Sequence, residues 1–411
     1  NYKVKSKGQY QIGQVHLSDD TTEIASMIRH NQQKTRVKSG KFYSVANLQA
    51  ERFRLTELAQ NLGYYDFSKD YLYYFVDTTA TGGLKTDIFF KIKPPADSAQ
   101  HEIYHMGNIS VYPAYTLNTR RDFNWRDTIR TENITVLQNE TFIKAKTLER
   151  FISQDPGDLY SKSKQELTVN HFLDLGVFKF VNLKYKLRQE NGKNYLDREL
   201  FLTPSLTRNT SIGIEASTAT SYDFGSALTF TYSDRNLFKG AEQFSFNLTS
   251  GVETQQGGRF INTLDLTAQA SLSFPRFITP FKINNDVSYF VPKTRINISD
   301  NFQRRTEFFT LNAFQIQFGY DWKETKYKRH EFYPINMSVI NLLGQTPVFR
   351  DTILVNNPRL ASSVQDGVIL GLNYRYTYTD QEVNTLKNYW FFQKGHRLCC
   401  ATAENYCAIH A

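Results

Sequence analysis

The most evident catalytic pattern in the sequence is H-E-x-x-H at residues 101–105. Two histidines four residues apart on a helix can hold zinc, and the glutamate between them can activate a water molecule. That geometry requires a helix, whereas this segment follows Pro94 and Pro95 and matches a predicted strand. In a strand, His101 and His105 would lie about 13 Å apart. We therefore interpret the match as coincidental and predict no metal site.

Other chemical signatures are weak. The sequence contains no glycine-rich phosphate loop, no G-x-S-x-G nucleophile elbow and no clustered acid pair, so we predict no catalytic residues and no cofactor. We interpret a group of four arginines as a solvated loop, in preference to an anionic-lipid or partner contact: Arg120, Arg121, Arg126 and Arg130. The 49 basic residues are scattered among 40 acidic ones, so nucleic-acid binding is not predicted.

Composition limits the class of protein further. The 411 residues have a mean hydropathy of −0.49, and no apolar run approaches the ~18 residues of a spanning helix. Aromatic residues make up 15%, which argues against disorder. The three cysteines lie at Cys399, Cys400 and Cys407, so the main body has no disulfide scaffold or zinc finger. The chain opens without a signal peptide, which predicts a cytoplasmic protein or a mature or partial chain.

An internal repeat organises the first half of the chain. Four blocks recur in the same order: residues 10–15 and 104–109, 40–44 and 157–161, 62–67 and 175–180, and 90–94 and 200–204. Ser44 and Ser161 are predicted helix N-caps, and Gly63 and Gly176 are predicted to end the helices that follow. Earlier helices are expected near residues 22–30 and 142–153. The repeat therefore predicts two α+β units of the form β-α-α-β-β.

After residue 204 the pattern changes to strict alternation of apolar and polar residues. The clearest segment is residues 264–274, and about eight or nine such segments lie between residues 207 and 393. Their length of nine to fourteen residues matches transmembrane β-strands, with aromatic residues toward the strand ends. We therefore predict an antiparallel transmembrane β-barrel, with a large soluble sheet as the alternative.

These features resemble the BamA/TamA-like outer-membrane assembly superfamily, in which POTRA repeats precede a barrel. The most specific match is to a family turn of the form D-R-N-L-F-G-G-G-E, which here comprises Asp234, Arg235, Asn236, Leu237, Phe238, Gly240 and Glu242. The segment at residues 175–180 is similarly typical of the POTRA domain nearest the barrel. The sequence is rich in aromatic residues and lysine, and in this respect it resembles the Bacteroidetes TamA-like (TamL) branch.

The resemblance implies a domain plan and a function. It places one POTRA domain at residues 8–95, a second at 101–204, and the first half of a sixteen-stranded barrel at 207–395. The protein would lie in the bacterial outer membrane with its POTRA domains in the periplasm, and would insert client proteins. Implied partners are outer-membrane lipids, unfolded outer-membrane proteins, and a TamB-like periplasmic partner or accessory lipoproteins. A two-partner-type secretion translocator is the main alternative, and a surface enzyme carried on the barrel is another.

The candidate sites are strand edges. We expect client strands to pair with two predicted strands that carry Tyr10, Ile12, Val15, Tyr104, Met106 and Ile109, with residues 71–77 and 184–188 as rival edges. The barrel's first strand, near residues 210–219, is expected to be short and weakly paired at a seam that contains Ile212, Gly213 and Ile214. By resemblance, this seam releases client strands into lipid.

The end of the sequence departs from the family pattern. Residues 396–411 show no alternation and hold all three cysteines, and the family's inward R-G-F/Y motif is not found. We therefore expect a C-terminally truncated barrel followed by a non-native tail.

Overall fold

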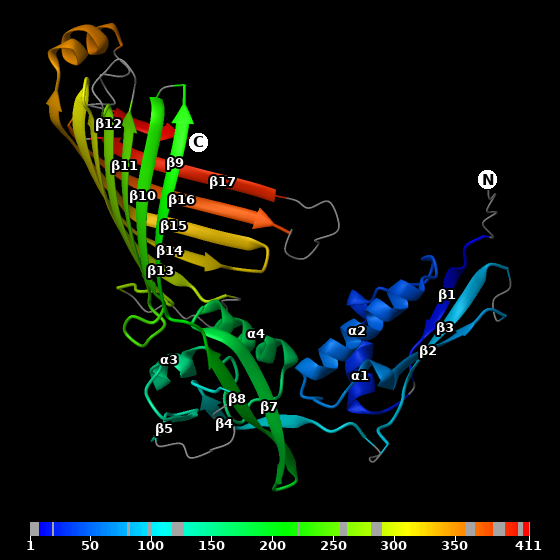
Figure 1. The fold of residues 1–411 in the computed structure, drawn as a ribbon. Coiled ribbons are helices and arrows are strands. Elements are labelled where there is room, and N and C mark those ends of the chain that lie inside the picture. Colours follow the sequence, from blue (N-terminus) through cyan, green and yellow to red (C-terminus); the bar gives the residue numbers. More distant parts are fainter. Residues whose placement is uncertain are drawn as a thin grey trace.

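The computed structural model describes residues 8–18, 20–79, 83–96, 100–116, 127–220, 222–254, 261–280, 290–357, 366–380, 391–401 and 406–410. It shows two small α/β units and one large curved sheet (Figure 1). No helix among the described residues is long and apolar enough to cross a membrane.

The first unit has the predicted β-α-α-β-β order. Its elements are β1 (Gln11–His16), α1 (Glu23–His30), η1 (Gln32–Lys34), α2 (Val45–Asn61), η2 (Lys69–Tyr71), β2 (Leu72–Asp77) and β3 (Lys85–Ile92). The sheet order is β1-β3-β2, with β1 parallel and β2 antiparallel to β3. Apolar side chains of both helices, such as Ile28 and Leu55, form a core with Leu72 and Phe90 of the sheet.

The second unit repeats this order with one addition. Its elements are β4 (Tyr104–Tyr112), β5 (Asp127–Arg130), β6 (Thr135–Gln138), α3 (Ala145–Arg150), α4 (Lys162–Asp174), β7 (Phe178–Glu190) and β8 (Lys193–Pro204). The order β5-β6-β4-β8-β7 places an extra hairpin beside the repeated strands. The predicted arginine loop falls partly here: Arg130 ends β5, whereas Arg120, Arg121 and Arg126 lie outside the described residues.

Capping residues define the long helices as predicted. The side chains of Ser44 and Ser161 accept the N–H three residues later, at 3.4 and 3.5 Å, at the starts of α2 and α4. Gly63 and Gly176 follow the helix ends with φ of +100° and +70°. A left-handed backbone at this position favours glycine, which carries no Cβ to clash.

The second half forms one ten-stranded sheet in which each strand pairs antiparallel with the next. Its strands are β9 (Arg208–Ala219), β10 (Tyr222–Asp234), β11 (Gln243–Thr254), β12 (Thr263–Phe274), β13 (Lys293–Arg305), β14 (Phe309–Lys323), β15 (Lys328–Gln345), β16 (Gly367–Thr379), β17 (Phe391–Ala401) and β18 (Tyr406–His410). A short helical turn, η3 (Phe349–Leu354), follows β15.

The pairing register of neighbouring strands aligns apolar side chains on one face of this sheet and polar side chains on the other. One row across six strands is entirely apolar: Phe246, Ala270, Ile298, Ile316, Met337 and Leu370. The neighbouring row on the other face is polar across five strands: Asn247, Gln269, Ser299, Gln315 and Ser338. On that polar face side chains bond across strands, as Ser271 does to Asn297 at 2.7 Å. The alternation therefore produces the two-faced sheet that was predicted.

The strand count between residues 207 and 393 agrees with the expected eight or nine, but the sheet continues beyond that range. Eight described strands lie between residues 208 and 379. β17 and β18 extend the sheet at residues 391–401 and 406–410, largely within the segment in which the sequence shows no alternation. Backbone pairing with β16 needs no apolar alternation, so the sequence pattern did not reveal these strands. The pairing does not test the segment's origin, and a non-native tail stays a prediction.

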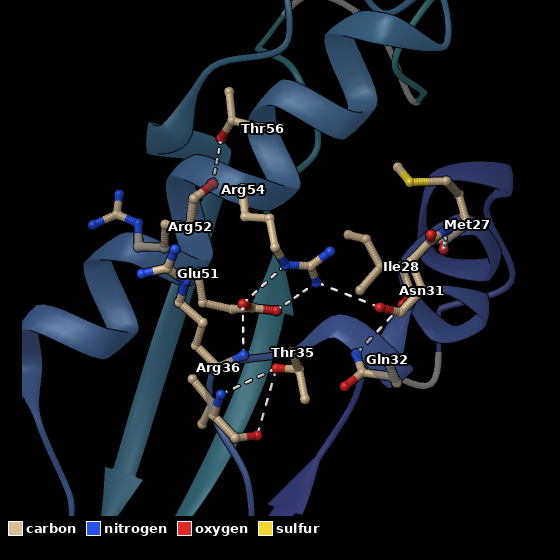
Figure 2. Close-up of polar contacts among 11 residues, drawn as sticks. Met27, Ile28, Asn31, Gln32, Thr35, Arg36, Glu51, Arg52, Arg54 and Thr56 are labelled. Atoms are coloured by element: carbon tan, nitrogen blue, oxygen red, sulfur yellow. Dashed lines mark hydrogen bonds and ion pairs between the residues drawn. The ribbon is translucent and has the colours of Figure 1, made fainter. Parts of the chain in front are cut away.

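A buried carboxylate fastens the connection between α1 and α2. Glu51, 2% exposed, accepts the backbone N–H of Arg36 at 3.0 Å and the guanidinium of Arg54 at 2.6 and 3.0 Å (Figure 2). Burial alone would raise the pKa of Glu51, but the hydrogen bonds from Arg54 and Arg36 outweigh it and lower the pKa. The ionised carboxylate therefore stabilises the folded unit.

We predict that Glu51→Gln loosens this connection. Lost charge-assisted bonds should lower the free energy of local opening by about 1–3 kcal/mol, seen as faster hydrogen exchange at the Arg36 amide. Because the folded pKa is depressed, the stabilisation is present above the unfolded pKa of about 4.3 and is lost as pH falls through the folded value. The difference between the two proteins should thus vanish in acid. Glu57→Gln, exposed on the same helix, is the control; equal effects of both changes would contradict this role.

Candidate functional site: strand edges and the junction turn

The H-E-x-x-H segment has no helical geometry. His101 precedes β4 and its Nε2 lies 2.9 Å from the Lys93 carbonyl oxygen, whereas His105 lies within β4 with its Nδ1 3.3 Å from the Gly157 carbonyl oxygen. Among the described residues, no group of three His, Cys, Asp or Glu side chains is placed to hold a metal. The segment leads into strand β4, which contains Tyr104 and His105, and this agrees with the strand that the repeat predicted.

The predicted client edge on β1 is largely occupied by the chain itself. β1 is an outer strand of its sheet, but residues 40–43 run alongside it. Ile12 donates to the Lys41 carbonyl and accepts from the Gly40 N–H, both at 2.8 Å, and Tyr43 donates to the Tyr10 carbonyl at 2.8 Å. We call residues 40–43 the first strap. Val15 lies beyond these bonds and packs against the core cluster around Ile12.

The predicted edge on β4 is wrong, because β4 is the central strand of its sheet. It pairs with β8 on one side and, at Ser110 and Val111, with β6 on the other. Residues 157–160, the second strap, cover the rest: Met106 donates to Asp158 at 2.7 Å and accepts from Gly157 at 2.8 Å. Tyr160 donates to the Tyr104 carbonyl at 3.0 Å.

The side chains of the predicted β4 edge are correspondingly enclosed. Tyr104, Met106 and Ile109 are 7%, 0% and 2% exposed. Both straps correspond to the second repeated block of the sequence, so a signal for them was present. The repeat showed that these segments recur but not that they bond to the strand edge.

The rival edges belong to β2 and β7. Each is an outer strand that pairs with only one other described strand, β2 with β3 and β7 with β8. Each also presents large apolar side chains to solvent. Phe75 on β2 is 59% exposed, and Phe180 and Leu187 on β7 are 60% and 64% exposed. An unpaired strand edge with apolar neighbours can accept another strand.

β9 is the outer strand at one end of the large sheet and pairs only with β10 among the described strands. Ile212 and Ile214 are 70% and 84% exposed, and Gly213 lies between them. With 12 residues β9 is as long as β11 and β12, so the expectation of a short strand is wrong. Its place at the sheet edge agrees with the predicted seam.

The predicted family turn, residues 234–242, joins β10 to β11 and lies against the second unit (Figure 1). We call it the junction turn. The Asn236 side chain donates to the Phe142 carbonyl at 2.7 Å and accepts the Ala241 N–H at 3.0 Å. The Lys144 N–H donates to the Lys239 carbonyl at 2.8 Å. Ala241, 1% exposed, belongs to the second unit's own hydrophobic core. The turn therefore docks the large sheet onto the second unit.

The turn's residue types explain its shape. The Asp234 carboxylate accepts the Asn236 N–H at 2.9 Å, a local turn that Asp favours. A Cβ on Gly240 would lie 2.3 Å from a Glu242 carboxylate oxygen, and the Gly240 N–H donates to that carboxylate at 2.8 Å. Leu237 and Phe238 remain 37% and 52% exposed, and Arg235 is exposed. Sequence reasoning found this motif but missed its docking role.

A second barrel connection reaches the same core. Val291, which precedes β13, is 5% exposed within it, and Gln243 at the start of β11 donates to the Leu175 carbonyl at 2.9 Å. At the end of α4, burial raises the pKa of Asp174, although Lys293 and Lys323 oppose the shift. The second unit is thus held to the sheet at two separate points.

The two small units also contact each other. Asn61 at the end of α2 accepts the Ser161 hydroxyl at 3.0 Å and the Ser163 N–H at 2.8 Å, at the start of α4. Tyr65 packs edge-on against three tyrosines of the second unit, and the Tyr104 hydroxyl donates to Asp66 at 2.5 Å. Burial, with the Asp66 bond and charge, raises the pKa of Tyr104, so its phenol stays protonated.

We predict that Asn236→Ala loosens the docking of the sheet onto the second unit. Two lost hydrogen bonds should cost about 2 kcal/mol. Spin labels at Lys193→Cys and Thr218→Cys, on the two parts of a protein whose three native cysteines are replaced by serine, should show a broader distance distribution in the variant. Asn209→Ala, exposed on β9, should leave the distribution unchanged. An unaltered distribution in Asn236→Ala would show that the turn does not hold the two parts together.

A scan against protein-family models and a search of curated proteins return no match. Among solved structures, BamA from Haemophilus ducreyi lacking POTRA domains 1–3 aligns with a TM-score of 0.51 at 10% identity, covering 95% of this chain and 64% of that chain. CdiB from Acinetobacter baumannii aligns with a TM-score of 0.49 at 11% identity, covering 97% and 63%. The chain thus spans less than two thirds of these structures. It shares the fold of BamA, in which POTRA-type α/β units precede an antiparallel barrel sheet.

Proposed function

We propose that the chain belongs to the BamA/TamA-like superfamily and assembles or translocates proteins at the bacterial outer membrane. The observation that carries the proposal is the D-R-N-L-F turn, which matches the family motif and docks the sheet onto the adjacent POTRA-type unit. The BamA-like fold supports the same assignment. The aromatic-rich and lysine-rich character of the sequence supports the TamL branch.

The sheet's two faces support a membrane location. Strands β9–β16 have 12 to 18 residues, enough to cross a bilayer at the usual tilt. The apolar row through Ile298 and Ile316 would face lipid, and the polar face would line the interior. The POTRA-type units, which contact the sheet at its connecting turns, would lie in the periplasm.

Strand exchange at open edges is the mechanism we infer. A client segment would pair with the free backbone groups of β2 or β7, and main-chain hydrogen bonds would supply affinity without chemistry. The client strand would then pair with β9, because lipid tolerates no unpaired backbone groups. The straps on β1 and β4 would confine capture to the remaining edges.

The partners we propose come from the resemblance to this superfamily. Unfolded outer-membrane proteins would supply the strands, outer-membrane lipids would receive them, and a TamB-like partner or accessory lipoproteins would deliver clients. A two-partner-type translocator would use the same fold, but its substrate would emerge in solution and not remain in the bilayer.

We predict that photocrosslinking distinguishes free strand edges from a strand that is paired on both sides. A benzoylphenylalanine at Phe75, Leu187 or Ile214 should crosslink an unfolded outer-membrane protein, because each lies on a free edge. The same probe at Leu266, which is 42% exposed on β12 between two paired strands, is the control. Equal crosslinking at all four positions, or none at any, would refute strand capture at edges.

A further inference from the structure

The second strap, residues 157–160, is held from two sides. On its outer side the first unit packs against it: the Gly63 carbonyl accepts the Tyr104 N–H at 2.9 Å, and a Cβ on Gly63 would lie 3.4 Å from Leu159 Cδ2. On its inner side the buried Gln154 amide donates to the Leu159 carbonyl at 3.0 Å. The strap therefore lies between the first unit and the interior of the second.

Gln154 is in turn bonded by a buried arginine. Arg198 on β8 is 0% exposed, and its Nη2 donates to Gln154 Oε1 at 2.8 Å. Its Cζ lies 5.8 Å from the ring centroid of Tyr185 on β7, within the range of a cation–π contact. Its Nε and Nη1 have no well-aligned acceptor among the described residues. A buried cation whose hydrogen bonds are only partly satisfied destabilises a fold.

The first unit shows that the fold itself does not require this polar pair. The repeated blocks align Gln154 with Val37, and they align Arg198 with a second apolar residue, Ile88. Val37 and Ile88, 3% and 0% exposed, belong to one apolar core cluster. Phe42 in the first strap is 55% exposed, with no other unit packed on it among the described residues. The polar pair thus occurs in the unit whose strap carries another unit.

A cluster of three tyrosines connects the arginine to the first unit. Tyr65 of the first unit packs edge-on against Tyr160 and Tyr185, with ring centroids 5.1 and 5.4 Å apart. Tyr160 and Tyr185 pack edge-on against each other at 6.1 Å. Tyr160 belongs to the second strap, and the Tyr185 ring contacts Arg198. A displacement of the first unit would therefore remove one ring from the cluster that contacts both the strap and the cation.

We propose that Arg198 and Gln154 couple the docking of the first unit to the closure of the second strap. With the first unit docked, Tyr65 keeps the Tyr185 ring on Arg198. The arginine then holds Gln154 on the strap, and both act as positioning residues. Undocking of the first unit releases the strap from the edge of β4. The inference rests on the proposed function and deepens it, because it makes β4 a regulated edge for client strands.

Hydrogen exchange of the full chain tests the coupling. The Met106 N–H bonds to the Asp158 carbonyl of the strap at 2.7 Å, so its exchange reports opening of the strap. Tyr65→Ala should accelerate exchange at Met106 about tenfold, as the loss of buried aromatic contacts provides. Tyr73→Ala, which removes an exposed tyrosine from the same unit, should leave it unchanged. Amides of the β7–β8 pair report the stability of the second unit as a whole and should not change.

Variants of the polar pair separate coupling from stability. Gln154→Val with Arg198→Ile takes the residue types of the first unit, and apolar replacement of a buried polar pair preserves folding. In this background Tyr65→Ala should leave exchange at Met106 unchanged. Arg198→Lys keeps the charge but not the planar guanidinium, so the effect of Tyr65→Ala should shrink there as well. An effect that is equal in all backgrounds, or absent in the native one, would overturn the coupling.

Addition of an unfolded outer-membrane protein separates this inference from the proposed function. The expected result is that the client protects Met106 in Tyr65→Ala but not in the native chain. Protection on β9 that never extends to Met106 would overturn the regulated edge and leave strand capture intact. No protection on β2, β7 or β9 in either protein would overturn the proposed function, whereas the exchange rates without client would still decide the coupling.

Discussion

The pairing of backbone N–H and C=O groups is the constraint on which the rest of this structure depends. A strand edge left without partners binds other strands, and in lipid it is not tolerated at all. The protein covers some of its strand edges itself and leaves others without a partner among the described residues. Its straps, residues 40–43 and 157–160, bond to β1 and β4, whereas β2, β7 and β9 keep a free edge among the described residues. We infer that function resides in the edges that the chain does not cover itself.

The junction turn fixes the position of the large sheet, and thus of β9, relative to the second unit and its edge strand β7. Ala241 is part of the second unit's core, and Asn236 and Lys239 bond to its backbone, so the sheet and the unit share buried apolar area and hydrogen bonds. Asn61 and Tyr65 connect the first unit to the second in a similar way. A client held at β7 would therefore lie in a defined position relative to β9, without a flexible linker between capture and insertion.

Local sequence signals predicted much of the fold. The serine caps, the glycines after the helices and the period-two alternation each reflect short-range sterics and hydrogen bonding, which a few neighbouring residues determine. The sequence did not predict that β4 lies at the centre of its sheet, because the β5–β6 hairpin occupies one side through contacts distant in sequence. The sequence did not predict that the sheet continues beyond residue 395, because that pairing needs only backbone groups.

The candidate site likewise combines features that the local sequence predicts with features that depend on contacts distant in sequence. The motif at residues 234–242 was recognised from its residue types, but its docking role depends on Phe142 and Lys144, about a hundred residues earlier. The edges on β2 and β7 were ranked below β1 and β4, because the repeat identifies strands and not the segments that cover them. The covering bonds of the straps became evident only in three dimensions.

The most direct test of the account is amide hydrogen exchange of the full chain with and without an unfolded outer-membrane protein. Exchange reports which backbone N–H groups acquire a partner. We predict new protection on β2 or β7 and on β9, with unchanged protection at Ile12 and Met106, whose amides already bond to the straps. New protection confined to β1 and β4, or protection unchanged throughout, would contradict the claim that the protein works through its uncovered strand edges.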